Sequence, residues 1–179
     1  LPQVHFVVLS LGGMTGIRLA AGHPERIDRL VVLCTSALLG PAQSWHDRAA
    51  LVRSEGTSAV AEAVVGRWYT EGFRAANPGR VAAAKAMVAS TPAEGYASCC
   101  EAIATMDLTV DLPRINAPTL AIAGADDPAT PPPHLRRIAD TVPDGRIIEV
   151  PASAHLANDE QPAIVNRALL GFLASGEVG

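Results

Sequence analysis

Four short apolar runs constrain the fold of this 179-residue chain more than any other feature. They occupy residues 5–9, 30–34, 119–123 and 146–150. The first two are typical of strands buried in a parallel sheet, and the last two are also predicted to be strands. Helical patterns follow at residues 11–21, 134–140 and 159–174. Because strands that alternate with helices form parallel sheets, the chain is predicted to be an α/β protein with four parallel strands and flanking helices.

The stretch between the second and third runs carries helix signals and no convincing strand. Helix starts are predicted near Ser44, Ser58, Asn77 and Thr91. The clearest is residues 91–94, a capping box with proline at the first helical position. A helical insertion of this kind is typical of a lid over a site. We therefore predict a core of residues 1–40 and 107–179, and a helical lid insertion of residues 41–106.

Ser10 lies where the first apolar run passes into the first helical pattern. A serine on a sharp strand-to-helix turn projects from the sheet and needs small neighbours, which Gly12 and Gly13 provide. Val8 departs from this pattern, because a glycine usually lies two residues before such a serine. The backbone N–H of Leu11, at the helix N-terminus, would be one oxyanion donor. The alternative is a Gly-rich turn with an incidental serine.

Two further candidates follow later strands. Asp126 and Asp127 come directly after the third run, and either could orient a histidine; alternatively, Asp-Asp-Pro forms only a turn. His155 lies in the loop after the fourth run and could also be merely exposed. Because ligands bind at the carboxyl ends of parallel strands, we expect these side chains to meet. Serine, acid and histidine in this order predict a catalytic triad.

The helical insertion supplies candidate substrate-binding residues, namely Trp45, Arg48 and Trp68. Both tryptophans could equally be part of its core. Arg48, Arg53 and Arg67 are predicted on solvated helix faces, from which one could bind a substrate carboxylate. The spacing of His134 with the two aspartates supports no metal site.

Charge and composition argue against several partners and compartments. The chain has 14 Lys+Arg and 18 Asp+Glu, a net charge of −4, and no basic run. This balance argues against nucleic acid or an anionic membrane as a partner. No apolar run is long enough to span a membrane, and no leader pattern is visible. Three cysteines, Cys34, Cys99 and Cys100, fit neither a disulfide framework nor a zinc spacing, which favours a reducing cytoplasm.

These motifs resemble the 3-oxoadipate enol-lactonase group of the α/β-hydrolase superfamily over nearly the whole chain. The stretches that carry the resemblance are residues 9–14, 24–27, 94–103, 123–132 and 154–158. The most specific are Gly-Tyr-Ala-Ser-Cys-Cys from Gly95 and Asp-Pro-Ala-Thr-Pro-Pro from Asp127. The resemblance implies Ser10 as nucleophile, His155 as general base and Asp127 as the acid. It implies hydrolysis of the enol-lactone to 3-oxoadipate, in the β-ketoadipate pathway of aromatic catabolism, without a cofactor.

The resemblance further implies that the chain begins in the middle of a partial α/β-hydrolase fold. The family has earlier strands and a His-Gly loop that supplies a second oxyanion N–H, and no stretch of this sequence corresponds to them. The strand before Ser10 would then be a hydrophobic edge. We expect a missing N-terminal polypeptide or a second copy of the chain to cover it.

A small-molecule lactone or ester is the expected substrate. Two alternatives stay open. One is a general carboxylesterase with the same triad and another acyl pocket. The other is a truncated, non-catalytic α/β-hydrolase fragment that lacks part of the oxyanion hole.

Overall fold

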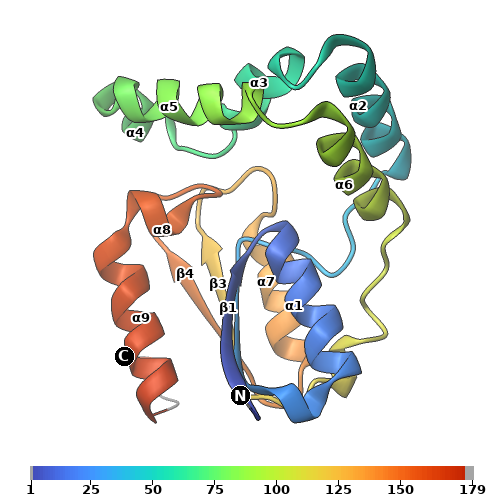
Figure 1. Ribbon diagram of the computed structural model, residues 1–179. Helices are drawn as coiled ribbons and strands as arrows, with labels where there is room; N and C mark the ends of the chain where they lie inside the picture. Colours follow the sequence, from blue (N-terminus) through green and yellow to red (C-terminus); the bar gives the residue numbers. More distant parts are fainter. Residues whose placement is uncertain (1, 176–179) are drawn as a thin grey trace. The chain divides into compact units, whose positions relative to one another are not determined.

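A computed structural model describes residues 2–175 (Figure 1). The chain divides into two compact units. The core unit comprises the described residues up to Ala37 and from Leu108 onward. The helical unit is Leu38–Asp107. That residues 41–106 act as a lid stays a prediction.

The core unit is built on one sheet of four parallel strands. In spatial order these are β1 (Val4–Leu9), β2 (Ile27–Leu33), β3 (Thr119–Gly124) and β4 (Gly145–Val150). The register pairs Leu9 with Leu33 and Leu33 with Ile122, so the carboxyl ends of the first three strands lie level. The predicted α/β fold with four parallel strands is therefore confirmed. What covers β1, an outer strand of this sheet, stays a prediction.

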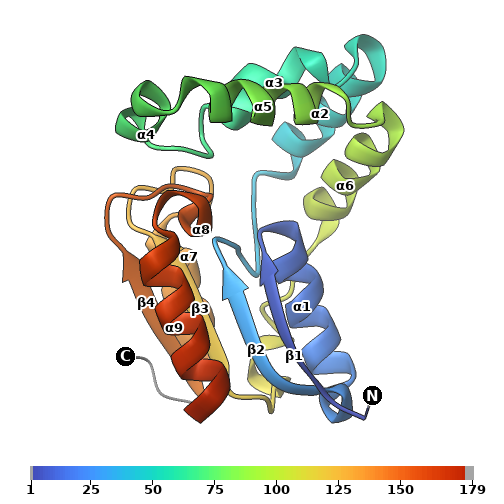
Figure 2. The ribbon, with the colours of Figure 1, turned by 60° about the vertical axis from the view of Figure 1, so that its left-hand side comes forward.

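Helices cover both faces of the sheet. On one face lie α1 (Leu11–Gly22) and α7 (Pro132–Thr141), and on the other lies α9 (Pro162–Ser175) (Figures 1 and 2). Shorter elements are η1 (Pro24–Arg26), η2 (Leu112–Arg114) and α8 (Ala157–Glu160). Phe172 of α9 is fully buried against the apolar residues of β2 and β3. The runs in β2 and β3 are apolar because helices cover both faces of these central strands, whereas β1 and β4 are more exposed.

The single closing helix expected over residues 159–174 is wrong. The structure has two helices there, α8 and α9, with Gln161 between them. The ring of Pro162 disfavours helical backbone at the residue before it, so the chain breaks at Gln161. Proline is well suited to the first turn of a helix, and Pro162 begins α9.

The helical unit contains five helices among its described residues. They are α2 (Ala42–Glu55), α3 (Ser58–Val65), α4 (Glu71–Ala76), α5 (Pro78–Ala89) and α6 (Ala93–Thr105). α2 packs against α6, and α3 against α5. An antiparallel bridge between Leu38 and Asp107 joins the two ends of the unit. The short helix α4 was not predicted.

The capping box expected at residues 91–94 does not form, and Ser44 is not the first residue of its helix. α2 begins at Ala42, and the hydroxyl of Ser44 donates to a backbone carbonyl at the start of the helix. α6 begins at Ala93, while the Thr91 hydroxyl donates 3.1 Å back to the Met87 carbonyl of the preceding helix. Glu94 forms an ion pair with Arg53 at 2.7 Å. The Thr91 hydroxyl and the Glu94 carboxylate therefore bond to other helices and do not cap α6.

The helix predicted to begin near Ser58 ends before Arg67, which was expected on a helix face. α3 stops at Val65, so Arg67 and Trp68 lie in turns and not on a helix face. Tyr69 follows them, buried, with its ring stacked on Phe73 at a centroid distance of 4.9 Å. This aromatic pair anchors the segment between α3 and α4.

Val8 is accommodated by glycines of α1. A Cβ atom built on Gly16 would lie 2.8 Å from Cγ2 of Val8 and 3.2 Å from Cδ1 of Leu30. A Cβ on Gly12 would lie 3.5 Å from Cβ of Val8. Because Gly12 and Gly16 of α1 have no side chains, they leave the space that a glycine in place of Val8 would otherwise provide.

We expect Gly16→Ala to lower the free energy of unfolding by about 1–3 kcal/mol, because the new methyl group overpacks against Val8. Val8→Ala in the same background should recover most of the loss, which a double-mutant cycle of urea unfolding would measure. Gly22→Ala is the matched control, since a Cβ there meets nothing within 4 Å. Equal unfolding energies for the two alanine variants would contradict the packing account.

Candidate active site

Ser10 lies on the sharp turn between β1 and α1. Its φ of 55° and ψ of −119° are rare for a residue with a side chain. Hydrogen bonds hold this backbone: the Ser10 N–H donates to the Leu33 carbonyl at 2.9 Å, and the Ser10 carbonyl accepts from the Met14 N–H at 3.2 Å. Ser10 is half-buried. Strained backbone that neighbouring bonds maintain is characteristic of functional sites.

Asp127 follows β3 and is the aspartate that the structure places against the histidine. Its carboxylate accepts hydrogen bonds from the Ala129 N–H at 2.7 Å, the Thr130 N–H at 3.1 Å and the Thr130 hydroxyl at 2.7 Å. The side chain is fully buried. Asp126 is exposed, and its N–H donates to the Ser153 carbonyl. Of the two neighbouring acids, only Asp127 faces inward.

His155 connects the other two side chains. Its Nδ1 lies 2.8 Å from Oδ2 of Asp127, and its Nε2 lies 2.8 Å from Oγ of Ser10. With the ring proton on Nδ1, His155 donates to Asp127 and its Nε2 accepts the Ser10 hydroxyl. His155 is buried. The structure thus brings together three predicted residues from the ends of three different strands.

The electrostatics of this cluster keep Asp127 ionised. Burial alone would raise the pKa of the Asp127 carboxyl. The hydrogen bond and charge of His155, together with the hydrogen bonds from Thr130, instead lower that pKa below its usual value. An ionised acid beside Nδ1 holds the histidine in one tautomer and stabilises the imidazolium when it forms.

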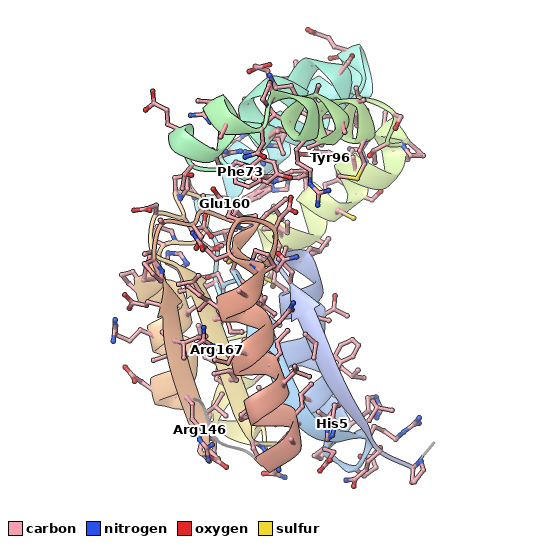
Figure 3. The ribbon with its side chains drawn as sticks, turned by 90° about the vertical axis from the view of Figure 1, so that its left-hand side faces the viewer. His5, Phe73, Tyr96, Arg146, Glu160 and Arg167 are labelled. Carbon is pink, nitrogen blue, oxygen red and sulfur yellow. The ribbon has the colours of Figure 1, made fainter. Side chains whose placement is uncertain are left out.

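Sequence reasoning missed three residues that support the cluster. Thr130 donates to Asp127, as described above. Glu160 accepts from the Ala154 N–H at 2.5 Å and so fixes the residue before His155 (Figure 3). The Thr35 hydroxyl donates to the Ser10 carbonyl at 2.6 Å. A threonine three residues after an aspartate is a recognisable turn signal, whereas nothing local marks Glu160 or Thr35.

Cys34 lies at the carboxyl end of β2 and is fully buried. Burial, with a smaller contribution from the Asp127 charge, raises the pKa of its thiol to about 12. A thiol that stays protonated is a poor nucleophile. Cys100 in the helical unit has its thiol pKa raised by burial as well. Both cysteines therefore behave as packing residues.

His134 was considered as a metal ligand, and the structure gives it another partner. Its Nδ1 lies 2.8 Å from the Ser36 hydroxyl. Over residues 2–175, no three His, Cys, Asp or Glu side chains cluster in a way that suits a metal ion. The expectation that no cofactor is needed stays a prediction. Among the described helices, none has the length and apolar character required to cross a membrane.

In the helical unit, Arg48 is held by aromatic side chains. Its guanidinium lies over the Trp45 ring, 4.5 Å from the centroid. Burial raises the pKa of Tyr96, while the charge of Arg48 and a hydrogen bond from it act in the opposite direction. Trp45 and Tyr96 both pack against the contact of α2 with α6, and Figure 3 labels Tyr96 there. Its stacking on Trp45 and its partial burial distinguish Arg48 from a freely solvated arginine.

Arg53 differs from Arg48 in its partners. It forms ion pairs with Glu94 and with Glu101. The hydrogen bonds and charge of Arg53, with a hydrogen bond from Ser98, hold the pKa of the Glu94 carboxyl at about 2. The prediction that Arg53 lies on a solvated face is incomplete, because its charge is already neutralised by two acids. Trp68 is half-buried in the turn after α3, and a role for it in substrate binding stays a prediction.

Comparisons with known proteins agree with this fold. Residues 1–162 match the family described as alpha/beta hydrolase fold. The chain is 40% identical over 178 residues to 3-oxoadipate enol-lactonase 2 of Acinetobacter baylyi, which confirms the resemblance to enol-lactonases. This match covers 94% of the chain and 63% of the relative. The chain thus spans less than two thirds of that protein's length.

Solved structures give the same picture. The enol-lactonase from Burkholderia xenovorans LB400 matches with a TM-score of 0.94 and 36% identity, covering 97% of this chain and 66% of that one. A thermophilic esterase from Thermogutta terrifontis matches with a TM-score of 0.85 and 28% identity, covering 92% of this chain and 62% of that one.

Proposed function

Because this chain belongs to the alpha/beta hydrolase fold family, we propose that it hydrolyses a small lactone or ester through Ser10, His155 and Asp127. One observation carries the proposal: His155 lies 2.8 Å from the Ser10 hydroxyl and 2.8 Å from the Asp127 carboxylate. This is the arrangement that a serine nucleophile needs, because its hydroxyl must lose a proton as it attacks.

The reaction follows from these contacts. Nε2 of His155 takes the proton as Oγ of Ser10 attacks the carbonyl carbon. The Leu11 N–H, at the start of α1, donates to the oxyanion that forms. Collapse of the tetrahedral intermediate breaks the ring or ester C–O bond, and His155 returns the proton to the leaving oxygen. Water then attacks the acyl-enzyme by the same route and restores Ser10.

The substrate we propose is 3-oxoadipate enol-lactone, hydrolysed to 3-oxoadipate in the β-ketoadipate pathway. The similarity to two enol-lactonases supports this choice. The resemblance to an esterase supports the second candidate, a general carboxylesterase with the same triad. The free thiols of Cys34, Cys99 and Cys100 support action in a reducing cytoplasm.

The test combines hydrolysis with covalent labelling. The chain is given the enol-lactone and, separately, the neutral ester p-nitrophenyl acetate, and its reaction with a fluorophosphonate is mapped by mass spectrometry. In that reaction the Ser10 oxygen bonds to phosphorus, fluoride leaves, and His155 takes the proton. Lactone hydrolysis with the label on Ser10 is the expected result. Hydrolysis of the ester alone would favour the carboxylesterase. A folded chain without a label would favour the non-catalytic alternative.

Arg48 is the proposed cation for the substrate carboxylate. A hydrogen-bonded ion pair of this kind contributes about 1.5–3 kcal/mol, so Arg48→Gln should lower kcat/KM for the charged lactone by roughly 10- to 150-fold. The neutral ester should be hydrolysed at nearly the original rate. Arg53→Gln is the matched control, because Glu94 and Glu101 already pair with that arginine. An equal loss for both substrates would argue against carboxylate recognition by Arg48.

A further inference from the structure

Resting on the proposed function, we propose that Thr35 is a positioning residue for the oxyanion site. Its hydroxyl holds the Ser10 carbonyl, and this fixes the direction of the Leu11 N–H. Thr35 touches none of the reacting atoms in the proposed mechanism. It acts through the peptide group that joins Ser10 to Leu11.

The peptide geometry carries the first step. The Thr35 hydroxyl donates to the Ser10 carbonyl at 2.6 Å, and the Met14 N–H donates to the same oxygen at 3.2 Å. A trans peptide is planar, so its C=O and N–H bonds point in opposite directions. Two donors that fix the carbonyl therefore also fix the N–H of Leu11. That N–H is at the first position of α1, where it has no acceptor within the helix.

The backbone conformation of Ser10 explains why a hydrogen bond to its carbonyl is needed. With φ at 55° and ψ at −119°, Ser10 lies in a sparsely populated region, and its ψ sets the orientation of the Ser10–Leu11 peptide. Strained residues keep one conformation only where the surroundings over-determine it. The hydroxyl of Thr35, in the turn after β2, adds a second hydrogen bond to the Ser10 carbonyl beside the one from Met14 of α1.

The local fold is shaped to bring Thr35 to this position. Cys34 has a φ of 42°, a left-handed conformation that turns the chain at the end of β2. Thr35 follows it, fully buried. A Cβ on Gly13 would lie 2.7 Å from three atoms of the Thr35 side chain, so only glycine at position 13 lets the hydroxyl reach α1. The left-handed turn at Cys34 and the glycine at position 13 thus both allow the hydrogen bond from Thr35 to Ser10.

The hydrogen bond from Thr35 matters more for the direction of the Leu11 N–H than for the stability of the fold. If the hydroxyl is lost, the Ser10 carbonyl still accepts from Met14, so no buried acceptor is left unpaired. A donor that points away from the oxyanion, however, stabilises the transition state less and leaves ground-state binding unchanged. The signature of Thr35 should therefore be a loss of kcat at constant KM.

The experiment compares Thr35→Val with Thr35→Ser in the full chain. Valine keeps the shape and removes the hydroxyl, and serine keeps the hydroxyl. Thr35→Val should lower kcat and the rate of fluorophosphonate labelling by roughly 10- to 100-fold, with KM and the melting temperature nearly unchanged. Thr35→Ser should recover most of both rates. Binding of a boronic acid, which becomes tetrahedral on Ser10, should weaken in proportion to kcat.

Thr15→Val is the matched control. The Thr15 hydroxyl also donates to a carbonyl of α1, that of Leu11 at 3.1 Å, but it is exposed. Its removal should leave labelling unchanged. Wild-type labelling rates in Thr35→Val would overturn the proposal for Thr35 alone. If Thr35→Ser were labelled as slowly as Thr35→Val, Thr35 would have only a packing role, and the proposal would be overturned as well. Absence of the label on Ser10 in the unmodified chain would overturn the proposed function together with this proposal.

Discussion

Ser10→Ala and His155→Ala are each expected to lower kcat by about 10⁶-fold, and the double variant should be no slower than either single one. Alanine at position 10 removes the attacking oxygen. Alanine at position 155 leaves the hydroxyl with its proton, because Nε2 is the base 2.8 Å from Oγ. Both changes disable the same step, so their effects do not add.

Steady-state hydrolysis, with the enzyme concentration set by fluorophosphonate titration of the unmodified chain, would measure these losses. Ser98→Ala and His23→Ala are the controls, because both side chains are exposed. They should retain full activity. A Ser10→Ala variant that kept more than about a hundredth of the rate would place the nucleophile elsewhere.

Asp127→Asn is expected to lower kcat by about 10⁴-fold. The asparagine can occupy the same space, but its amide group favours the wrong tautomer of His155 and carries no charge to stabilise the imidazolium. Asp126→Asn, one residue earlier and exposed, should stay within a few-fold of the original rate. Equal losses in the two variants would refute the choice of acid.

Asp127→Asn should also change how the free energy of unfolding depends on pH. The pKa of Asp127 is lowered in the folded chain, so its ionisation stabilises the fold above the unfolded carboxyl pKa of about 3.9. That contribution is lost as the pH falls toward the folded-state value. Asp127→Asn should therefore lose less of its free energy of unfolding than the unmodified chain between about pH 5 and pH 2, as urea titrations at a series of pH values would show.

Two strands could be predicted from the sequence most directly, because most of β2 and all of β3 are buried and form continuous apolar runs, whereas β1 and β4 are more exposed. The choice between Asp126 and Asp127 could not be made from the residues alone, since both follow the same strand. The resemblance favoured Asp127, and the hydrogen bonds of Asp127 agree with that choice. Distance along the chain explains the difference, because the partner of this acid is 28 positions away.

The errors have the same physical origin. Thr91 and Glu94 have the residue types of a capping box, but the Thr91 hydroxyl donates to a carbonyl of the preceding helix and Glu94 pairs with Arg53 of α2. Thr35 gave no signal, because a threonine after a strand is ordinary until the strand beside it brings Ser10 within reach. Propensity describes a segment, whereas these contacts belong to pairs of segments.

The connection between β2 and β3 has a consequence for how the chain folds. The entire helical unit, Leu38–Asp107, separates these two paired strands in the sequence, whereas the backbone hydrogen bonds of each helix join residues only four positions apart. Local contacts form faster than distant ones. Helical circular dichroism should therefore recover before the sheet closes during refolding. Ser10 and His155, which are 145 positions apart, come into contact only after the sheet closes. The appearance of fluorophosphonate reactivity during refolding would therefore report when this last step is complete.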